Sequence, residues 1–124
     1  MKTPATLLFA LVAAMPCLAQ TAEEVKVPLR SGTYFFEHRH AEHPDMTSFR
    51  LLVTLKGNEI SIVKPNSGGP FPQGEIAKGT LFWHVASEQW IIVTSDEDRM
   101  ATEVGGCSDG PEVVDLKKRI YWTC

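Results

Sequence analysis

The sequence lacks the motifs that most readily identify an enzyme. It contains no Gly-rich phosphate-binding loop, no dinucleotide-binding fingerprint, no zinc-deaminase motif and no G-x-S-x-G nucleophile elbow. Beyond residue 19 it also has no apolar run approaching the roughly 20 residues that a membrane-spanning helix needs. No stretch of useful length there has the period of an amphipathic helix. These absences argue against nucleotide chemistry, a serine hydrolase and a transmembrane segment in the mature chain.

Basic residues are few and scattered. The chain has 12 lysines and arginines against 15 aspartates and glutamates, which gives a formal net charge of −3 at pH 7. No basic cluster is longer than Lys117-Lys118-Arg119. Proteins that bind nucleic acid or an anionic membrane surface usually carry a denser basic stripe. The composition therefore predicts binding to neither.

The first 19 residues have the layout of a secretory signal peptide. Lys2 supplies a positive charge, the segment from Ala5 to Met15 is apolar, and small residues follow at Cys17 and Ala19. We expect cleavage after Ala19, which leaves residues 20–124 as a single periplasmic or secreted domain. Lipid attachment at Cys17 is the weaker alternative, because the residues before this cysteine do not match the pattern that bacterial lipidation requires.

Two cysteines remain after cleavage. Cys107 and Cys124 are an even number in an exported chain, which favours a disulfide over two free thiols. Such a bridge closes a loop of about 17 residues. The loop-entropy model assigns it about 3 kcal/mol of stability.

The rest of the mature chain consists of short apolar segments between turn-forming residues. The expected strands are residues 33–40, 48–55, 59–63, 80–85, 89–95, 112–116 and 119–124. Gly57-Asn58 is typical of a two-residue hairpin turn. Two further hairpins are expected, one across Ala86-Ser87-Glu88 and one across Lys117-Lys118. This pattern predicts an all-β domain, an antiparallel barrel or sandwich of seven to eight short strands.

Two segments between the strands have their own signals. Residues 65–74 hold three prolines and three glycines, which excludes a continuous strand and predicts a loop. Ser95 is followed three positions later by Asp98, a pattern similar to a capping box. We therefore expect a helical turn after Ser95.

Three of the four histidines lie in the stretch EHRHAEHPD, which begins at Glu37. If residues 33–40 are extended, His38 and His40 project from the same face. His43 would then fold back as a third ligand of a Zn²⁺ or Cu²⁺ ion. The fourth ligand would be Glu42 or Asp45. A solvated strand end is the favoured interpretation, so no cofactor is expected; the metal site and acid/base catalysis are the alternatives.

An acidic loop surrounds the first mature cysteine. In EVGGCSDGPEVVD, Asp109-Gly110-Pro111 is ordinary turn chemistry, and Asp109 and Glu112 are the candidate binding residues. A disulfide at Cys107 would rigidify this loop and so lower the cost of ordering it around a basic partner. Paired carboxylates of a small hydrolase are the alternative interpretation.

The aromatic residues divide into two groups. The tryptophans are expected in the core or lining the barrel, with a ligand pocket as the alternative; they are Trp83, Trp90 and Trp122. His84 is expected to be a hydrogen-bonded sheet histidine. Phe71 lies between prolines in the 65–74 loop, where it serves either as an interface anchor or as a plug for the barrel mouth.

Together these patterns predict a non-catalytic binding or inhibitory module for a protein or small ligand. Its contacts would come from residues 65–74 and 105–112, with Phe71, Asp109 and Glu112 as the binding residues. The alternatives are a metal-binding protein that uses the three clustered histidines and a small hydrolase that uses the loop carboxylates.

Overall fold

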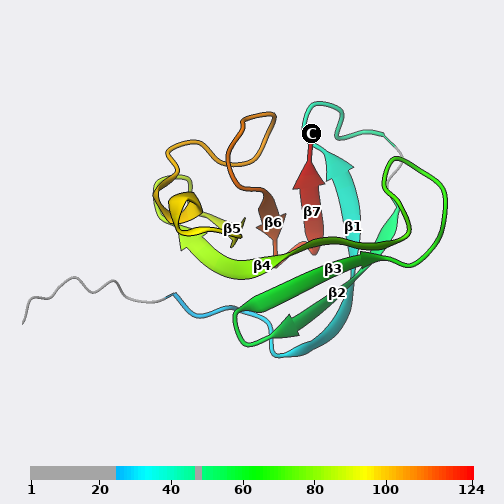
Figure 1. The fold of residues 1–124 in the computed structure, drawn as a ribbon, viewed down its shortest axis with the longest axis horizontal. Helices are drawn as coiled ribbons and strands as arrows, with labels where there is room; N and C mark the ends of the chain where they lie inside the picture. Colours follow the sequence, from blue (N-terminus) through cyan, green and yellow to red (C-terminus); the bar gives the residue numbers. More distant parts are fainter. Residues whose placement is uncertain (1–24, 47–48) are drawn as a thin grey trace, which may run out of the picture.

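The computed structural model describes residues 25–46 and 49–124, which form a closed seven-stranded β-barrel (Figure 1). The strands are β1 (Gly32–His40), β2 (Arg50–Lys56), β3 (Glu59–Lys64), β4 (Gly74–His84), β5 (Gln89–Val93), β6 (Val113–Asp115) and β7 (Ile120–Thr123). A 3-10 helix, η1 (Asp96–Met100), lies between β5 and β6. The predicted all-β class is confirmed, and the architecture is a barrel. The predicted signal peptide and its cleavage site lie outside the described residues.

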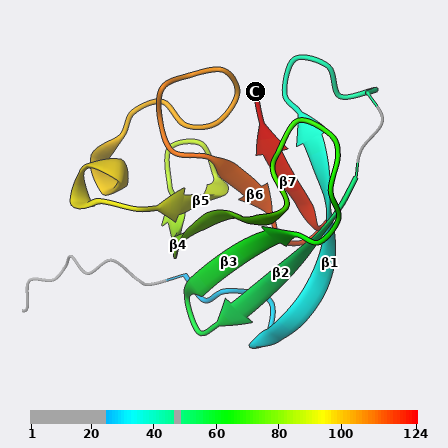
Figure 2. The same cartoon turned by 45° about the vertical axis from the view of Figure 1, so that its right-hand side comes forward.

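The strands pair in chain order, and the first and last strands close the sheet. Every sequential pair is antiparallel, whereas β1 and β7 run parallel, with Glu37 opposite Ile120 and His40 opposite Thr123. Figures 1 and 2 show these two strands side by side and pointing the same way. The three predicted hairpins are confirmed by the pairings of β2 with β3, β4 with β5, and β6 with β7.

Strand β4 is longer than predicted, because it begins at Gly74 instead of residue 80. Its first half pairs with β3, and only Thr80–His84 pairs with β5. A Cβ atom at Gly79 would lie 2.5 Å from the carbonyl oxygen of Val93. Because glycine has no Cβ atom, β4 can pass close to the backbone of Val93 at the end of β5. Residues 75–79 are bordered by β3 on one side. Within the described chain no strand pairs with them on the other side, which we call the free edge of β4.

Alternation along the strands places one apolar face inside the barrel. The buried core residues are Phe36, Leu51, Val53, Leu55, Ile60, Ile62, Leu81, Trp90, Ile92, Val114, Leu116 and Tyr121. A second apolar cluster lies on the outer face of β5 and β6, around Ile91, Val93 and Val113. Val104 packs against it from the long connection between β5 and β6. This connection therefore covers part of the barrel wall.

Two local features hold the β5–β6 connection in place. The carboxylate of Asp98 accepts hydrogen bonds from the backbone N–H groups of Thr94 (2.8 Å) and Ser95 (3.3 Å) at the start of η1. The expected helical turn after Ser95 is thereby confirmed. The Cys107–Cys124 disulfide is also confirmed, with its Cα atoms 5.1 Å apart. Among the described residues, no helix has the length and apolar character to cross a membrane.

Candidate functional site

Three connections gather at one end of the barrel, which we call the loop end. They join β1 to β2, β3 to β4, and β5 to β6, and they surround the end of β7 near Cys124 (Figure 2). The three residues predicted to bind a partner all belong to these connections. Phe71 lies before β4, and Asp109 and Glu112 lie before β6.

An aromatic cluster fills the barrel mouth at the loop end. The buried ring of His38 stacks on Phe49, with ring centroids 4.7 Å apart. Phe71 meets His38 edge-on at 5.2 Å and Phe49 at 5.9 Å. The half-buried ring of Phe71 therefore packs on the aromatic cluster, as a plug of the barrel mouth would. Its use as an interface anchor stays a prediction.

The ring of His38 is buried and hydrogen-bonded inside the barrel. Its Nε2 shares a hydrogen bond of 2.7 Å with Oγ1 of Thr123. Burial, and in second place the charge of His40, lowers the pKa of His38 below its usual value. A neutral ring can stack on phenylalanine without leaving a buried charge unpaired.

Acidification is expected to destabilise the fold through His38. Because its folded-state pKa lies below the unfolded value of about 6.5, the unfolded chain binds more protons, and stability falls as the pH drops below about 6.5. Urea unfolding at pH 7.5 and pH 5.5 measures this loss. His38→Gln, which cannot titrate, should show a smaller loss than the wild type. His43→Gln, at an exposed position, is the control, and an equal loss in both variants would contradict the assignment.

The structure does not bring the three clustered histidines together. The ring centroids of His40 and His43 lie 5.1 Å apart, and Nδ1 of His40 accepts a hydrogen bond from the backbone N–H of Glu42. His38 instead faces the barrel interior. Among the described residues, the one group of three potential ligands that converges within 4.8 Å is Glu42 with the two cysteines. Both sulfurs are bonded to each other, so they are not free to bind a metal. The Zn²⁺ or Cu²⁺ site stays a prediction with no preformed set of ligands.

Buried polar groups near the mouth are paired. The hydroxyl of Tyr121 donates to Oε1 of Glu112, and burial, followed by this carboxylate, raises the pKa of Tyr121 well above its usual value. Nζ of the buried Lys64 donates to the carbonyl of Asn66. Glu112 therefore has a structural role as well as its predicted binding role.

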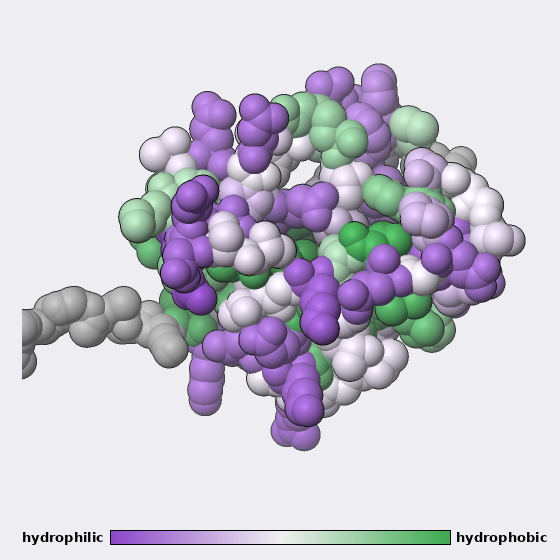
Figure 3. Space-filling model, in the orientation of Figure 1, coloured by the Kyte–Doolittle hydropathy of each residue, from purple (hydrophilic) through white to green (hydrophobic). Residues whose placement is uncertain are grey.

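A groove of about 370 Å³ opens beside the free edge of β4; we call it the edge groove. Its walls are Ile76, Ala77 and Lys78 of β4, Ile92 of β5, Thr94 just after β5, Asp98 of η1, and residues 109–112. Figure 3 shows that hydrophilic and near-neutral residues cover much of this face of the molecule, with hydrophobic residues between them. The predicted binding residues Asp109 and Glu112 thus come together here, whereas Phe71 lies over the barrel mouth.

The edge groove carries an excess of negative charge. Asp98, Asp109 and Glu112 supply carboxylates, and Lys78 supplies the one cation among the lining residues. The backbone N–H of Thr94 holds the pKa of Asp98 below its usual value, so this group stays ionised. No histidine, serine or cysteine is among the residues described as lining the groove. The hydrolase alternative stays a prediction.

All three tryptophans border a smaller cavity of about 230 Å³, near the β4–β5 and β6–β7 turns. Trp83 and Trp90 meet edge-to-face at 5.3 Å, and Trp90 is buried in the core. Trp90 therefore belongs to the core, the partly buried Trp83 and Trp122 pack against the two apolar clusters, and all three line a pocket. His84 is hydrogen-bonded on both ring nitrogens, to Ser87 (2.7 Å) and to the carbonyl of Ala101 (2.8 Å), as predicted.

The sequence reasoning missed the free edge of β4. The available signal was the pair of glycines, Gly74 and Gly79, on either side of an apolar Ile76-Ala77 step. Isolated glycines in a strand mark bends and close backbone contacts. Comparisons of the chain with protein-family models, with curated proteins and with solved structures give no match.

Proposed function

We propose that this protein is a non-catalytic binding or inhibitory module that captures an extended segment of a partner protein along the free edge of β4. The observation that carries the proposal is the unpaired edge beside the edge groove. Exposed strand edges present unpaired N–H and C=O groups, and many binding domains use them to add a strand from a partner.

The opposite wall of the groove suits a binding role because it is fixed in place. Residues 109–112 follow Cys107, which the disulfide ties to Cys124 beside β7. The Glu112 carboxylate is also held by the Tyr121 hydroxyl. A wall that is already ordered loses little conformational entropy when a partner binds.

The charge of the groove indicates the chemistry of the partner segment. The carboxylates of Asp98, Asp109 and Glu112 outnumber the single cation Lys78. Complementary charge speeds association and selects against acidic partners. We therefore propose a segment that contains lysine or arginine, met in the periplasm or outside the cell. The disulfide supports such an oxidising compartment.

A displayed library of random peptides tests this function. We expect the selected peptides to be enriched in lysine and arginine and to slow amide hydrogen exchange at residues 75–79, where the new strand would pair. Asp109→Lys should weaken the affinity for a selected peptide about tenfold or more, since it replaces an attractive charge with a repulsive one.

Asp45→Lys is the matched control for this experiment. Asp45 is equally exposed but lies on the β1–β2 connection, outside the edge groove. Its substitution should leave the affinity unchanged. Selected peptides without basic residues, or unchanged exchange at residues 75–79 on binding, would refute the proposal.

A further inference from the structure

A second groove lies on the outside of the barrel, where β1 runs between β2 and β7. It has a volume of about 360 Å³. Its lining residues are Phe35, Phe36, Glu37, Arg39, Arg50, Lys118, Arg119 and Ile120. Four of these side chains are cationic and one is acidic, in a chain whose formal net charge is −3. We call this surface the basic groove.

The barrel register brings these cations together from distant parts of the sequence. Glu37 on β1 lies opposite Arg50 on one side and Ile120 on the other. Its backbone N–H donates to the carbonyl of Arg119 at 2.9 Å. Arg39 follows Glu37 on the same outward face of β1. The groove therefore exists only because the first and last strands of the barrel are paired.

Aromatic rings orient two of the cations without neutralising them. The guanidinium of Arg50 lies over the ring of Phe35 at 5.2 Å, and that of Arg119 lies over Tyr34 at 5.0 Å. A cation–π contact leaves the guanidinium charged, and the N–H donors of this group lie in its plane. These donors form the fork that binds phosphate or carboxylate oxygens in pairs.

The acid in the groove offsets only a small part of the positive charge. Glu37 forms a salt bridge with Arg39 at 3.1 Å, with 50% of the Glu37 side chain and 36% of the Arg39 side chain exposed. The Nε of Arg39 is buried and has no hydrogen-bond partner among the described residues. Within residues 25–46 and 49–124, Arg50, Lys118 and Arg119 form no salt bridge. In the basic groove, the cations without a salt bridge therefore outnumber the single acidic side chain.

Arg119 has a backbone conformation that is unfavourable for a residue with a side chain. Its φ is 58°, in the left-handed region that glycine or asparagine adopts at lower cost. An arginine at this turn position costs some stability. Its guanidinium lies over the ring of Tyr34, which holds the side chain in place.

We propose that the basic groove binds a phosphate ester, with Arg50 and Arg119 as its main contacts and Arg39 and Lys118 as supporting charges. Arginine forks match phosphate oxygens in geometry and charge. A volume of about 360 Å³ exceeds a single phosphate and leaves room for the small group attached to it. Phe35, which is 55% exposed, offers an apolar contact beside the charged group. This site is independent of the edge groove.

Two probes distinguish a soluble phosphate from a lipid headgroup. Inorganic pyrophosphate is titrated into the full-length mature protein and followed by NMR shifts of the backbone amides of residues 37–39, 50 and 118–120. Vesicles of phosphatidylcholine with and without phosphatidylglycerol are tested by co-sedimentation. Binding of pyrophosphate at these amides, or binding that requires phosphatidylglycerol, supports the proposal, and either should weaken as salt is added.

The decisive variant is Arg50→Gln combined with Arg119→Asn. Asparagine tolerates a left-handed backbone better than arginine, so this change should not unfold the turn. We expect the double variant to bind at least about tenfold more weakly, because it loses two charge-assisted contacts. No binding of either probe to the wild type, or equal binding by the double variant, would overturn the proposal.

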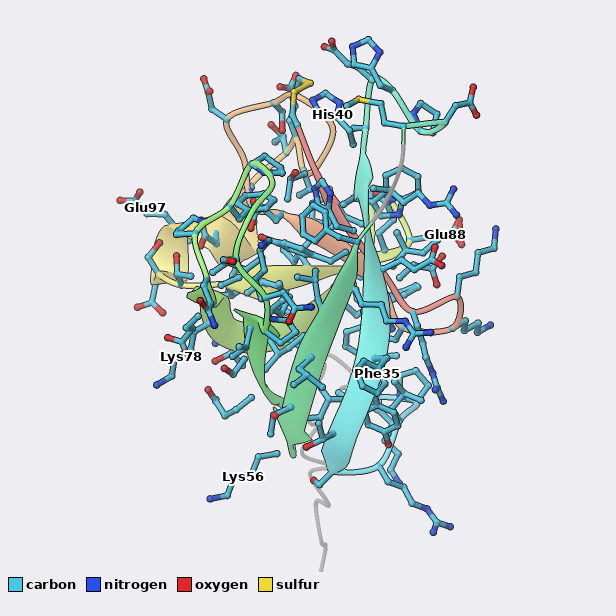
Figure 4. All side chains as sticks on the ribbon, turned by 90° about the vertical axis from the view of Figure 1, so that its right-hand side faces the viewer. Phe35, His40, Lys56, Lys78, Glu88 and Glu97 are labelled. Carbon is cyan, nitrogen blue, oxygen red and sulfur yellow. A yellow bond between two sulfur atoms is a disulfide. The ribbon has the colours of Figure 1, made fainter. Side chains whose placement is uncertain are left out.

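Lys117→Gln combined with Lys56→Gln is the matched control. It removes the same charge, but neither residue lines the basic groove. Lys117 belongs to the same turn as Arg119, and Lys56 lies at the far end of β2 from Arg50. Figure 4 shows Phe35 beside β1 and Lys56 well away from it, at the lower left. The control variant should bind as the wild type does, and a loss equal to that of the double variant would indicate a net-charge effect and overturn the site.

Discussion

Replacing Phe36 by alanine is expected to lower the free energy of unfolding by about 3–5 kcal/mol. The Phe36 side chain is 1% exposed and packs in the barrel interior with Leu51 and Val53. Its removal leaves a cavity that a closed sheet cannot easily collapse around, because the backbone on both sides is held by paired strands. Urea unfolding followed by tryptophan fluorescence measures the change.

The neighbouring Phe35 provides the matched control for this substitution. It has the same side chain on the same strand but points outward and is 55% exposed. Phe35→Ala should cost about 1 kcal/mol or less, mainly through the lost contact with Arg50. A larger loss for Phe35→Ala than for Phe36→Ala would mean that β1 is shifted by one residue, since such a slip exchanges its two faces.

Breaking the Cys107–Cys124 disulfide is expected to lower the free energy of unfolding by about 3 kcal/mol. The bond closes a separation of 17 positions and attaches the β5–β6 connection to the end of β7. In a domain of this size that loss corresponds to a decrease in Tm of at least about 12 °C. Differential scanning calorimetry of the Cys107→Ser/Cys124→Ser variant measures it.

The reduced wild-type protein serves as the comparison for the double serine variant. Both should melt at similar temperatures, and a reducing agent should have no effect on the variant. Peptide binding at the edge groove should also weaken, because residues 109–112 lose one of their attachments. If the free energy of unfolding falls by less than about 1 kcal/mol, these residues are held by their packing against Val113 and Tyr121 rather than by the disulfide.

Local signals were enough to predict most of the strands. Alternating apolar residues located β1, β2 and β3 to within about two residues, and Gly57-Asn58 identified the turn between the last two. The first half of β4 was missed because Gly74, Lys78 and Gly79 have low strand propensity. These residues form a strand because β3 pairs with them, and a pairing partner is a tertiary feature.

The candidate sites depended more strongly on long-range structure. The sequence correctly placed His38 and His40 on one face of β1, but that face is the barrel interior, where aromatic rings surround His38. The basic groove could not be found by counting charges along the chain. Its cations come from residues 39, 50, 118 and 119, and they become neighbours only when the barrel closes.

The parallel pairing of β1 with β7 also determines the order in which the protein can fold. His38 and Thr123, which share a hydrogen bond across this seam, are 85 positions apart in the chain. Contacts of such long sequence separation form late and slow the folding of β-domains. Because a chain is synthesised from its N-terminus, β1 keeps an open edge towards β7 until β7 itself has been made. Until then, the unpaired backbone groups of this edge can pair with another chain, so this seam is the part of the domain most exposed to aggregation.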